Sequence, residues 1–480
     1  MSHGHGHASP AKERATSPSG SWAVLTLLCF AQFMLIVDIT VVQVALPSIG
    51  GELGLDREAL TWVVTTYTLC FGGLMVLGGR LADALGARRT LLVGLILFTA
   101  ASLVCALASS GTVLILGRAL QGVGAALLSP AALAILTSTF HGQRRNQALG
   151  VWAAIGGTGA ALGVLLGGVL TESLGWAWAF FVNVPIGLLV GILVPVFIRS
   201  APARKERLDL PGALAITLAT ALLIYGLVTA GENGWAAAGT LLPLTGAALL
   251  YMAFVLIERS VQAPLMRAAT LTRRPVISGM FVMLVATGLM LGLFFLSSFY
   301  LQQVLGFSAL ETGLTFLPVA IAITLGAQLG AHLIGKIGGR PVAVAAFVLT
   351  AAGAALMTRV SPDASAYTTL LPGFILAALG IGPAFVTATT TTMANIPPDE
   401  TGVASGVINT FHELGGSIGV AVVSTVAAAG LASSSASTDG FISGFVLCAI
   451  VAGTASLIAL RLVPAGKPAK AFVGHGHGHG

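Results

Sequence analysis

The chain has 480 residues, of which 56% are hydrophobic and only 8% are charged. A soluble domain carries about 25% charged residues, so this composition excludes an ordinary soluble protein and indicates an integral membrane protein. The formal net charge of +6 would suggest a nucleic-acid partner in a soluble chain. Here the basic residues occupy short loops between apolar runs, so they report membrane topology, and no nucleic-acid partner is expected.

Both ends of the chain are polar. Histidine alternates with glycine in the N-terminal residues 1–20 and again in residues 464–480. Such tails bind transition metals weakly, but we expect them to be solvated and assign them no function. Fourteen apolar runs lie between them, each close to the roughly 20 residues that a bilayer core requires. They cover residues 21–46, 59–79, 90–109, 112–139, 147–170, 178–198, 210–230, 236–257, 275–303, 312–335, 341–359, 367–393, 403–429 and 441–462.

The basic residues predict how these spans are oriented. An even number of spans puts both termini on the same side of the membrane. All Lys and Arg residues other than Arg57, Arg118 and Arg359 fall in the N-terminal tail, in loops after even-numbered spans, or at and beyond the C-terminal end of the last span. The positive-inside rule therefore predicts a multi-pass protein of the plasma membrane with both termini in the cytoplasm.

The first span carries a carboxylate. Asp38 lies in the apolar run Leu35–Pro47, where an acid costs about 2.5–3.5 kcal/mol on insertion scales, so it is expected to face a cavity or a partner. Arg118 of the fourth span is the candidate partner, because both residues lie about 10–13 Å from the outer ends of their spans. We expect a role in proton coupling or gating, since an embedded acid beside an arginine can change partner on protonation. A static ion pair that fixes packing is the alternative.

A short charged turn joins the second and third spans. It has the sequence G-R-L-A-D-A-L-G-A-R-R-T-L from Gly79 to Leu91. Two spans joined by so short a turn are antiparallel neighbours. Within the turn, Asp83 can pair with an arginine or cap a helix, and Gly86 allows the backbone to turn tightly. The spacing G-x-L-A-D-x-x-G-x-R-R resembles the turn between the second and third spans of the major facilitator superfamily of transporters. The resemblance implies a part in conformational switching for Gly79, Asp83, Gly86, Arg88 and Arg89.

Further motifs resemble the same superfamily. Span 1 has D-x-T-V-V-x-V-A-L-P from Asp38, with Gln43 where the family usually has Asn, and span 4 has R-x-x-Q-G-x-G from Arg118. Gln121 of the second motif is a candidate substrate-binding residue. Span 5 resembles the family's antiporter motif, with Val164 in place of its proline, and its glycines leave a stripe on which another helix can approach closely. The span 5 residues assigned to switching are Gly159, Gly163, Gly167 and Gly168.

The arrangement of the spans predicts the architecture. Two basic loops, 199–209 and 258–274, flank two spans without an embedded charge, so we expect two six-helix bundles plus an inserted helical pair. The arrangement resembles the fourteen-span drug:proton antiporters of the QacA/EmrB type. This resemblance implies an all-α integral membrane fold of fourteen transmembrane helices, an interfacial binding site and alternating access. The expected units are 1–20 (tail), 21–198 (N-terminal bundle), 199–274 (linker with the inserted pair), 275–463 (C-terminal bundle) and 464–480 (tail).

The second half has a deeply embedded acid, Glu413 of span 13, near the membrane midplane. Asn409, Glu413 and Ser417 are four residues apart and form one polar face, which is expected to line water or substrate. His412 is expected to point elsewhere as a packed histidine. Because Asp38 lies beside an arginine, it should stay ionised more readily than Glu413, so Glu413 is the better candidate to take up a proton.

The expected substrate site is lipophilic. Span 9 carries methionine and aromatic side chains at three- and four-residue spacing, which suit varied apolar ligands, and ordinary helix packing is the alternative explanation of this stripe. Tyr67 lies near the depth of Asp38 and is expected to join the pocket. The candidate substrate-binding residues are Tyr67, Gln121, Met283, Thr287, Met290, Phe294, Asn409 and Ser417.

Several chemistries are not expected. The sequence lacks the nucleotide-binding loop G-x-x-x-x-G-K-[ST] and the metalloprotease motif H-E-x-x-H, so neither ATP as the energy source nor an enzyme activity is predicted. The four cysteines lie inside apolar runs without metal-site spacing, so no metal or other cofactor is expected.

The combined motifs predict a proton-coupled exporter of lipophilic or cationic small molecules such as drugs. Its partners would be the small-molecule substrate, protons and the lipid bilayer. One alternative is a metabolite importer or uniporter of the same fold, which the missing proline of span 5 favours. The other is a sensor or lipid-handling membrane protein that transports nothing.

Overall fold

The computed structural model describes residues 18–55, 57–198, 210–260, 268–394, 396–397, 400–432 and 438–466. Within these ranges the chain forms α-helices and two short π-helical turns, and no strand. The helices before residue 200 are α1 (Pro18–Leu53), α2 (Arg57–Leu85), α3 (Ala87–Ala106), α4 (Gly111–Thr139), α5 (Gly142–Leu174), α6 (Trp178–Phe181) and α7 (Asn183–Phe197). Those after it are α8 (Leu210–Asn233), α9 (Ala238–Ser260), α10 (Ala268–Leu271), α11 (Arg274–Phe299), η1 (Tyr300–Val304), α12 (Ala309–Ile337), α13 (Gly339–Met357), η2 (Ala366–Leu370), α14 (Leu371–Met393), α15 (Thr401–Ala432) and α16 (Asp439–Leu462).

Two glycines make equivalent turns in the two halves of the chain. Gly86 separates α2 from α3 with a φ of 94°, and Gly338 separates α12 from α13 with a φ of 88°. This left-handed backbone region favours glycine because other residues carry a Cβ atom that clashes there. The turn predicted between the second and third spans is therefore repeated between α12 and α13.

Twelve helical segments of the described part are apolar enough, and at 19–31 residues long enough, to cross a bilayer. The fifth and thirteenth predicted spans fall in α5 and α15, which have 33 and 32 residues and are not among these twelve. The protein is thus an all-helical multi-pass membrane protein, and the count of fourteen spans stays a prediction.

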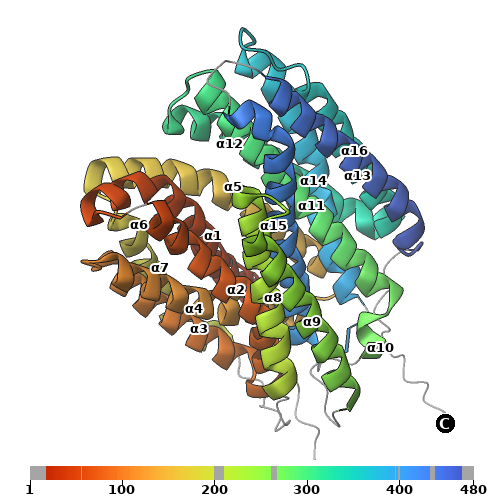
Figure 1. The fold of residues 1–480 in the computed structure, drawn as a ribbon. Coiled ribbons are helices and arrows are strands. Elements are labelled where there is room, and N and C mark those ends of the chain that lie inside the picture. The colour runs from red at the N-terminus through yellow and green to blue at the C-terminus, as the bar shows by residue number, and fades with distance from the viewer. Residues whose placement is uncertain are drawn as a thin grey trace, which may run out of the picture.

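The long helices form two groups that lie side by side (Figure 1), with α1–α7 in one and α11–α16 in the other. In the first group α4 packs against α2 and α3, and α1 packs against α5. In the second group α13 packs against α14 and α16, and α14 also packs against α12. The groups meet along two seams, one where α5 contacts α12 and one where α2 contacts α15.

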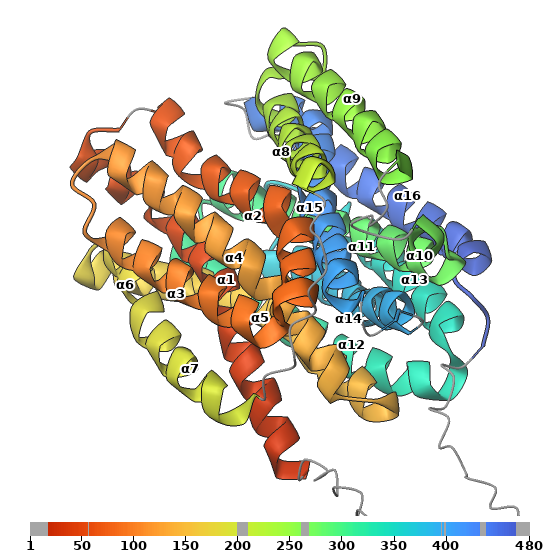
Figure 2. The ribbon, with the colours of Figure 1, turned by 90° about the horizontal axis from the view of Figure 1, so that it is seen from below.

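The hairpin of α8 and α9 lies outside both groups, at the seam between α2 and α15 (Figure 2). A Cβ atom added to Gly73 of α2 would lie 3.2 Å from the Cβ of Ala221 in α8, so these two helices cross closely. The Trp62 ring of α2 stacks on Tyr225 of α8 with centroids 6.0 Å apart. Small residues permit such approach between membrane helices. The helical pair that the sequence predicted as an insertion therefore covers one seam.

Candidate functional site

The structure brings Asp38 of α1 and Arg118 of α4 together. Their side chains are 0% and 1% exposed, and Arg118 Nη1 lies 2.6 Å from Asp38 Oδ2. Arg118 Nε also donates to the Val63 carbonyl of α2 at 3.1 Å. A buried charge is tolerated when it is paired and hydrogen-bonded, and α1 supplies the carboxylate and α2 a carbonyl for this guanidinium.

Neutral side chains complete the shell around Asp38. Gln121 Nε2 and Asn183 Nδ2 donate to Asp38 Oδ1 at 3.0 Å and 2.8 Å. Gln121 also donates to Ser102 Oγ at 2.8 Å and accepts from Arg118 Nη1 at 2.9 Å. Hydrogen bonds to an ionised carboxylate are short and strong, so these donors from α4 and α7 hold the Asp38 side chain in place.

Asn183 and Ser102 are functional candidates that the sequence analysis did not select. Asn183 is completely buried at the start of α7, and Ser102 is completely buried in α3. The sequence signal that could have identified Asn183 is its side-chain amide inside an apolar run, because a polar group in a membrane span requires a partner.

Tyr67 of α2 covers the ion pair. Its ring centroid lies 4.1 Å from the guanidinium carbon of Arg118, which is cation–π distance. Tyr67 is 1% exposed, and its hydroxyl has no hydrogen-bond partner among the described residues. In this conformation Tyr67 therefore packs against the ion pair.

The residues assigned to switching in the turn between α2 and α3 occupy two kinds of position. Asp83 near the end of α2 accepts hydrogen bonds from the backbone amides of Gly402 and Val403, at 2.7 Å and 2.8 Å, and so caps the first turn of α15. A Cβ atom added to Gly79 would collide with the Gly402 carbonyl, so the two helices touch there. This contact joins the two helix groups at the end of α2 that the basic residues predict to be cytoplasmic.

Arg88 and Arg89 lie in the first turn of α3, just after Gly86. Arg89 is exposed, and neither side chain makes a hydrogen bond or ion pair within the part of the chain that the structure describes. They are thus close to the α2–α15 contact in sequence but take no part in it in this conformation.

The glycine stripe of α5 faces α1. Added Cβ atoms would collide with Ile36 at Gly159 and with Thr40 at Gly163, and would lie 3.0 Å from Val41 Cα at Gly167. At Gly168 an added Cβ atom would meet open space, so Gly168 is not part of this stripe. The side chain of Val164 lies outside the described residues. The stripe is thus a close helix crossing of α1 and α5.

Glu413 lies on α15 at the seam with α2. Its side chain is 18% exposed, and a Cβ atom added to Gly72 of α2 would lie 3.6 Å from the Glu413 Cβ. His412 Nδ1 lies 3.4 Å from Glu413 Oε1. The expectation that His412 points elsewhere is therefore wrong: the two neighbouring side chains turn toward each other.

The other members of the predicted polar face have protein partners. Asn409 Nδ2 donates to Ser129 Oγ of α4 at 3.2 Å, and Ser129 Oγ donates to Gln32 Oε1 of α1 at 3.1 Å. This chain of side chains links α15 to the first helix group. Ser417 Oγ instead donates to the Glu413 carbonyl of its own helix at 3.1 Å.

Residues 415–419 have the spacing G-x-S-x-G of a hydrolase nucleophile turn. That motif requires a sharp strand-to-helix turn that exposes the serine, whereas these residues lie inside α15. Gly415 and Gly419 pack against Leu284 and Gly288 of α11. Here the glycines serve a close helix crossing.

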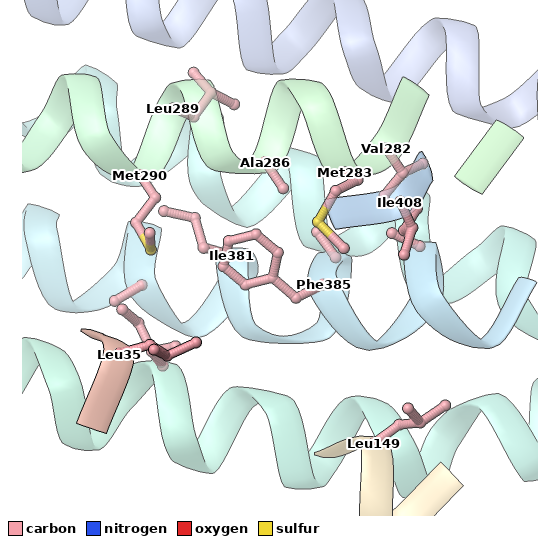
Figure 3. Packing of buried hydrophobic residues seen from close by; sticks show 14 of the residues in the cluster. Leu35, Leu149, Val282, Met283, Ala286, Leu289, Met290, Ile381, Phe385 and Ile408 are labelled. Carbon is pink, nitrogen blue, oxygen red and sulfur yellow. The ribbon is translucent and has the colours of Figure 1, made fainter. Parts of the chain in front are cut away.

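The predicted methionine stripe of α11 packs inside the second group. Met283 and Met290 are 6% and 5% exposed and point from α11 toward Ile381 and Phe385 of α14 (Figure 3). Thr287 is completely buried and bonds the carbonyl of Met283 at 3.0 Å. Figure 3 also shows that Leu35 of α1 and Leu149 of α5 border the same apolar cluster, so side chains from both helix groups meet there.

Phe294, the last residue of the stripe, belongs to an aromatic group. Its ring centroid lies 5.0 Å from Phe316 of α12 and 4.9 Å from Phe374 of α14, both in edge-to-face geometry. Aromatic pairs favour this arrangement. Phe294 therefore links three helices of the second group.

Comparison with known proteins identifies the family. The family model described as Major Facilitator Superfamily matches residues 28–420. The puromycin resistance protein pur8 of Streptomyces alboniger is 40% identical over 443 residues, which cover 89% of this chain and 87% of that protein. The cephamycin export protein CmcT of Amycolatopsis lactamdurans is 38% identical over 429 residues, covering 88% of each chain.

Solved structures show the same fold. The human organic anion transporter MFSD10 matches with a TM-score of 0.64 and 16% identity, over 94% of this chain and 100% of that chain. The proton:xylose symporter XylE matches with a TM-score of 0.66 and 16% identity, over 94% and 98% of the two chains. The family model and the curated relatives together cover most of the sequence, and the chain belongs to the Major Facilitator Superfamily.

Proposed function

We propose that this protein exports lipophilic or cationic small molecules, antibiotics among them, in exchange for protons. As a superfamily member it is a multi-pass membrane transporter. Drug efflux in general is supported by relatives whose names describe puromycin resistance, cephamycin export, lincomycin resistance, and tetracenomycin C resistance and export. We further assign the chain to the fourteen-span drug:proton antiporters, with α5 and α15 as membrane spans and both termini in the cytoplasm. Neither ATP nor a catalytic step is part of this proposal.

The coupling proposal is carried by the contrast between the two embedded acids. Asp38 is completely buried and accepts hydrogen bonds from Arg118, Gln121 and Asn183, so protonation would disrupt several bonds to a charged group. Glu413 is 18% exposed at the seam between α15 and α2. We therefore assign proton uptake to Glu413. The ion pair of Asp38 and Arg118 would instead rearrange when the helices move between conformations.

The two seams supply a physical basis for alternating access. In the observed conformation Asp83 caps α15, Gly79 touches Gly402, and Asn409 bonds Ser129. All of these contacts bind α15 to the first helix group. We infer that this conformation is closed toward the cytoplasm, and that rocking of one group against the other must break these contacts to admit substrate from that side.

The substrate surface is proposed where the two groups share one apolar cluster. Met283 and Met290 of α11 lie in that cluster with Leu35 of α1. Unbranched methionine side chains repack easily, which suits substrates of different shape. Opening of the cytoplasmic seam would then uncover this surface next to Glu413, whose ionised form would attract a cationic substrate.

The proposal is tested by expression in a bacterial host that lacks its own efflux pumps. Puromycin, a cephamycin, lincomycin and tetracenomycin C form the first panel. We expect lower cellular accumulation of at least one compound, and loss of that effect when a protonophore collapses the proton gradient. Asp38→Asn, produced at the same membrane level, is the inactive control. Increased accumulation would support import instead, and unchanged accumulation across a wider panel would contradict transport of drugs.

A further inference from the structure

A hollow lies at the end of α13 that the basic residues predict to be on the outer side of the membrane. It has a volume of 340 Å³ and lies between the end of α13 and the π-helical turn η2. Liquid water takes about 30 Å³ per molecule, so the hollow has room for a group the size of a phosphate with its glycerol. It is lined by Leu356, Arg359, Thr368, Thr369, Pro372 and Gly373.

The hollow has three polar side chains in its lining. Arg359 and Thr368 are exposed, and Thr369 is partly buried. None of these three side chains forms a hydrogen bond or ion pair with a residue that the structure describes. The lining has one cation and two hydroxyl groups but no acid, which favours an anion with several acceptor oxygens.

The position of Arg359 makes it unusual in this chain. Nearly all other Lys and Arg residues fall on the predicted cytoplasmic side, as the positive-inside rule requires. Arg359 lies two residues beyond Met357, the last residue of α13, a span whose other end carries the turn at Gly338. An arginine just beyond the outer end of a span lies at the depth of the lipid headgroups.

An apolar track leads from Arg359 into the membrane region. Leu349, Ala352 and Leu356 are exposed on α13 at spacings of three and four residues, and Arg359 lies three residues after Leu356, in the turn that follows the helix. Leu349 and Leu356 are 37% and 39% exposed. Seven residues of helix extend about 10 Å, which matches the upper part of an acyl chain below its headgroup.

We propose that this hollow binds an anionic glycerophospholipid of the outer leaflet. Arg359 pairs with the phosphate, Thr368 and Thr369 donate hydrogen bonds to its oxygens, and one acyl chain follows Leu356, Ala352 and Leu349. The bound lipid would fasten α13 to η2 and α14 in the second helix group. This site is independent of the proposed drug export, because none of its residues belongs to the substrate or proton-coupling sets.

The test is thermal unfolding of the delipidated full-length protein in detergent, with dioleoyl phosphatidylglycerol as the probe. We expect the lipid to raise the unfolding midpoint of the wild type, with a shift at least halved in Arg359→Gln and reduced in Thr368→Val/Thr369→Val. These positions are at the surface, so the variants are expected to fold. Arg144→Gln, which removes an exposed arginine near the opposite membrane face, should keep the full shift.

Two results would overturn the proposal. The first is an unchanged lipid shift in Arg359→Gln, together with an unchanged number of phosphatidylglycerol molecules retained in native mass spectrometry. The second is an equal shift from the same concentration of soluble glycerol 3-phosphate, because the site would then bind a free anion and the apolar track would contribute nothing.

Discussion

Glu413 is partly exposed and lies at the seam between α15 and α2. From this position we predict that Glu413 takes up the proton that is coupled to transport. Glu413→Gln keeps the size of the side chain but cannot release a proton, so we expect loss of pH-driven drug transport while drug binding is retained. The measurement is drug uptake into inverted membrane vesicles under an imposed pH gradient. Glu172→Gln, which neutralises an exposed acid at the end of α5, should transport normally. Full coupled transport of every substrate by Glu413→Gln, cationic ones included, would make Glu413 structural and leave Asp38 to carry the proton.

The shell around Asp38 predicts a graded loss of stability. Asp38→Asn leaves the buried Arg118 without its carboxylate, which typically costs about 3–5 kcal/mol. Asn183→Leu removes a single neutral donor to the Asp38 carboxylate, which typically costs about 1.5–3 kcal/mol. Thermal unfolding in detergent should therefore show a larger drop for Asp38→Asn than for Asn183→Leu. Equal midpoints for the two variants would show that the ion pair does not stabilise the first helix group.

Sequence reasoning identified part of this site and missed part of it. A helix rises 1.5 Å per residue, so the number of residues from the outer end of each span gives the depth of a side chain in the membrane. Asp38 and Arg118 have similar depths, which was enough to predict that they pair. Depth alone does not tell which face of α3 or α7 meets α1, so Ser102 and Asn183 were not selected. The bonds of Asn183 to Asp38 and of Ser102 to Gln121 depend on helix rotation, which tertiary packing decides.

At the scale of helices, the α1–α5 crossing distinguishes two glycines of α5 that the sequence analysis placed in one group. Gly163 faces Thr40 without room for a Cβ atom, whereas Gly168 faces open space. We expect Gly163→Val to push α5 away from α1 and to abolish transport or folding. Gly168→Val should fold and transport normally. Membrane levels and drug accumulation measured side by side would check this, and a matching defect in both variants would contradict the assigned crossing.

The turn between α2 and α3 shows that local backbone geometry can be predicted from the sequence, whereas a long-range contact cannot. Gly86 was predicted to turn the backbone tightly. Both Gly86 and Gly338 adopt a positive φ, which glycine can do at low energy because it has no side chain. The partner of the neighbouring Asp83 was not predictable in the same way. It is the first turn of α15, which follows more than 300 residues later in the chain.

For the whole molecule, the account predicts that α5 crosses the membrane with its first turn in the cytoplasm. Single cysteines at His141 and Glu172, two exposed positions at opposite ends of α5, would test this in a variant without the four native cysteines. A membrane-impermeant maleimide should label position 172 in intact cells and position 141 only after permeabilisation. Labelling of both positions from the same side would exclude α5 as a span.

The central claim is that export is driven by protons moving the opposite way. Each charge that crosses 100 mV carries about 2.3 kcal/mol, so one proton can drive roughly 50-fold accumulation of a drug. The most direct measurement uses proteoliposomes with a pH-sensitive dye inside, a clamped membrane potential and a gradient of an exported antibiotic. We predict proton flux opposite to the drug gradient in the wild type and none in Glu413→Gln. Drug transport without proton movement, or proton flux in the same direction as the drug, would contradict the account.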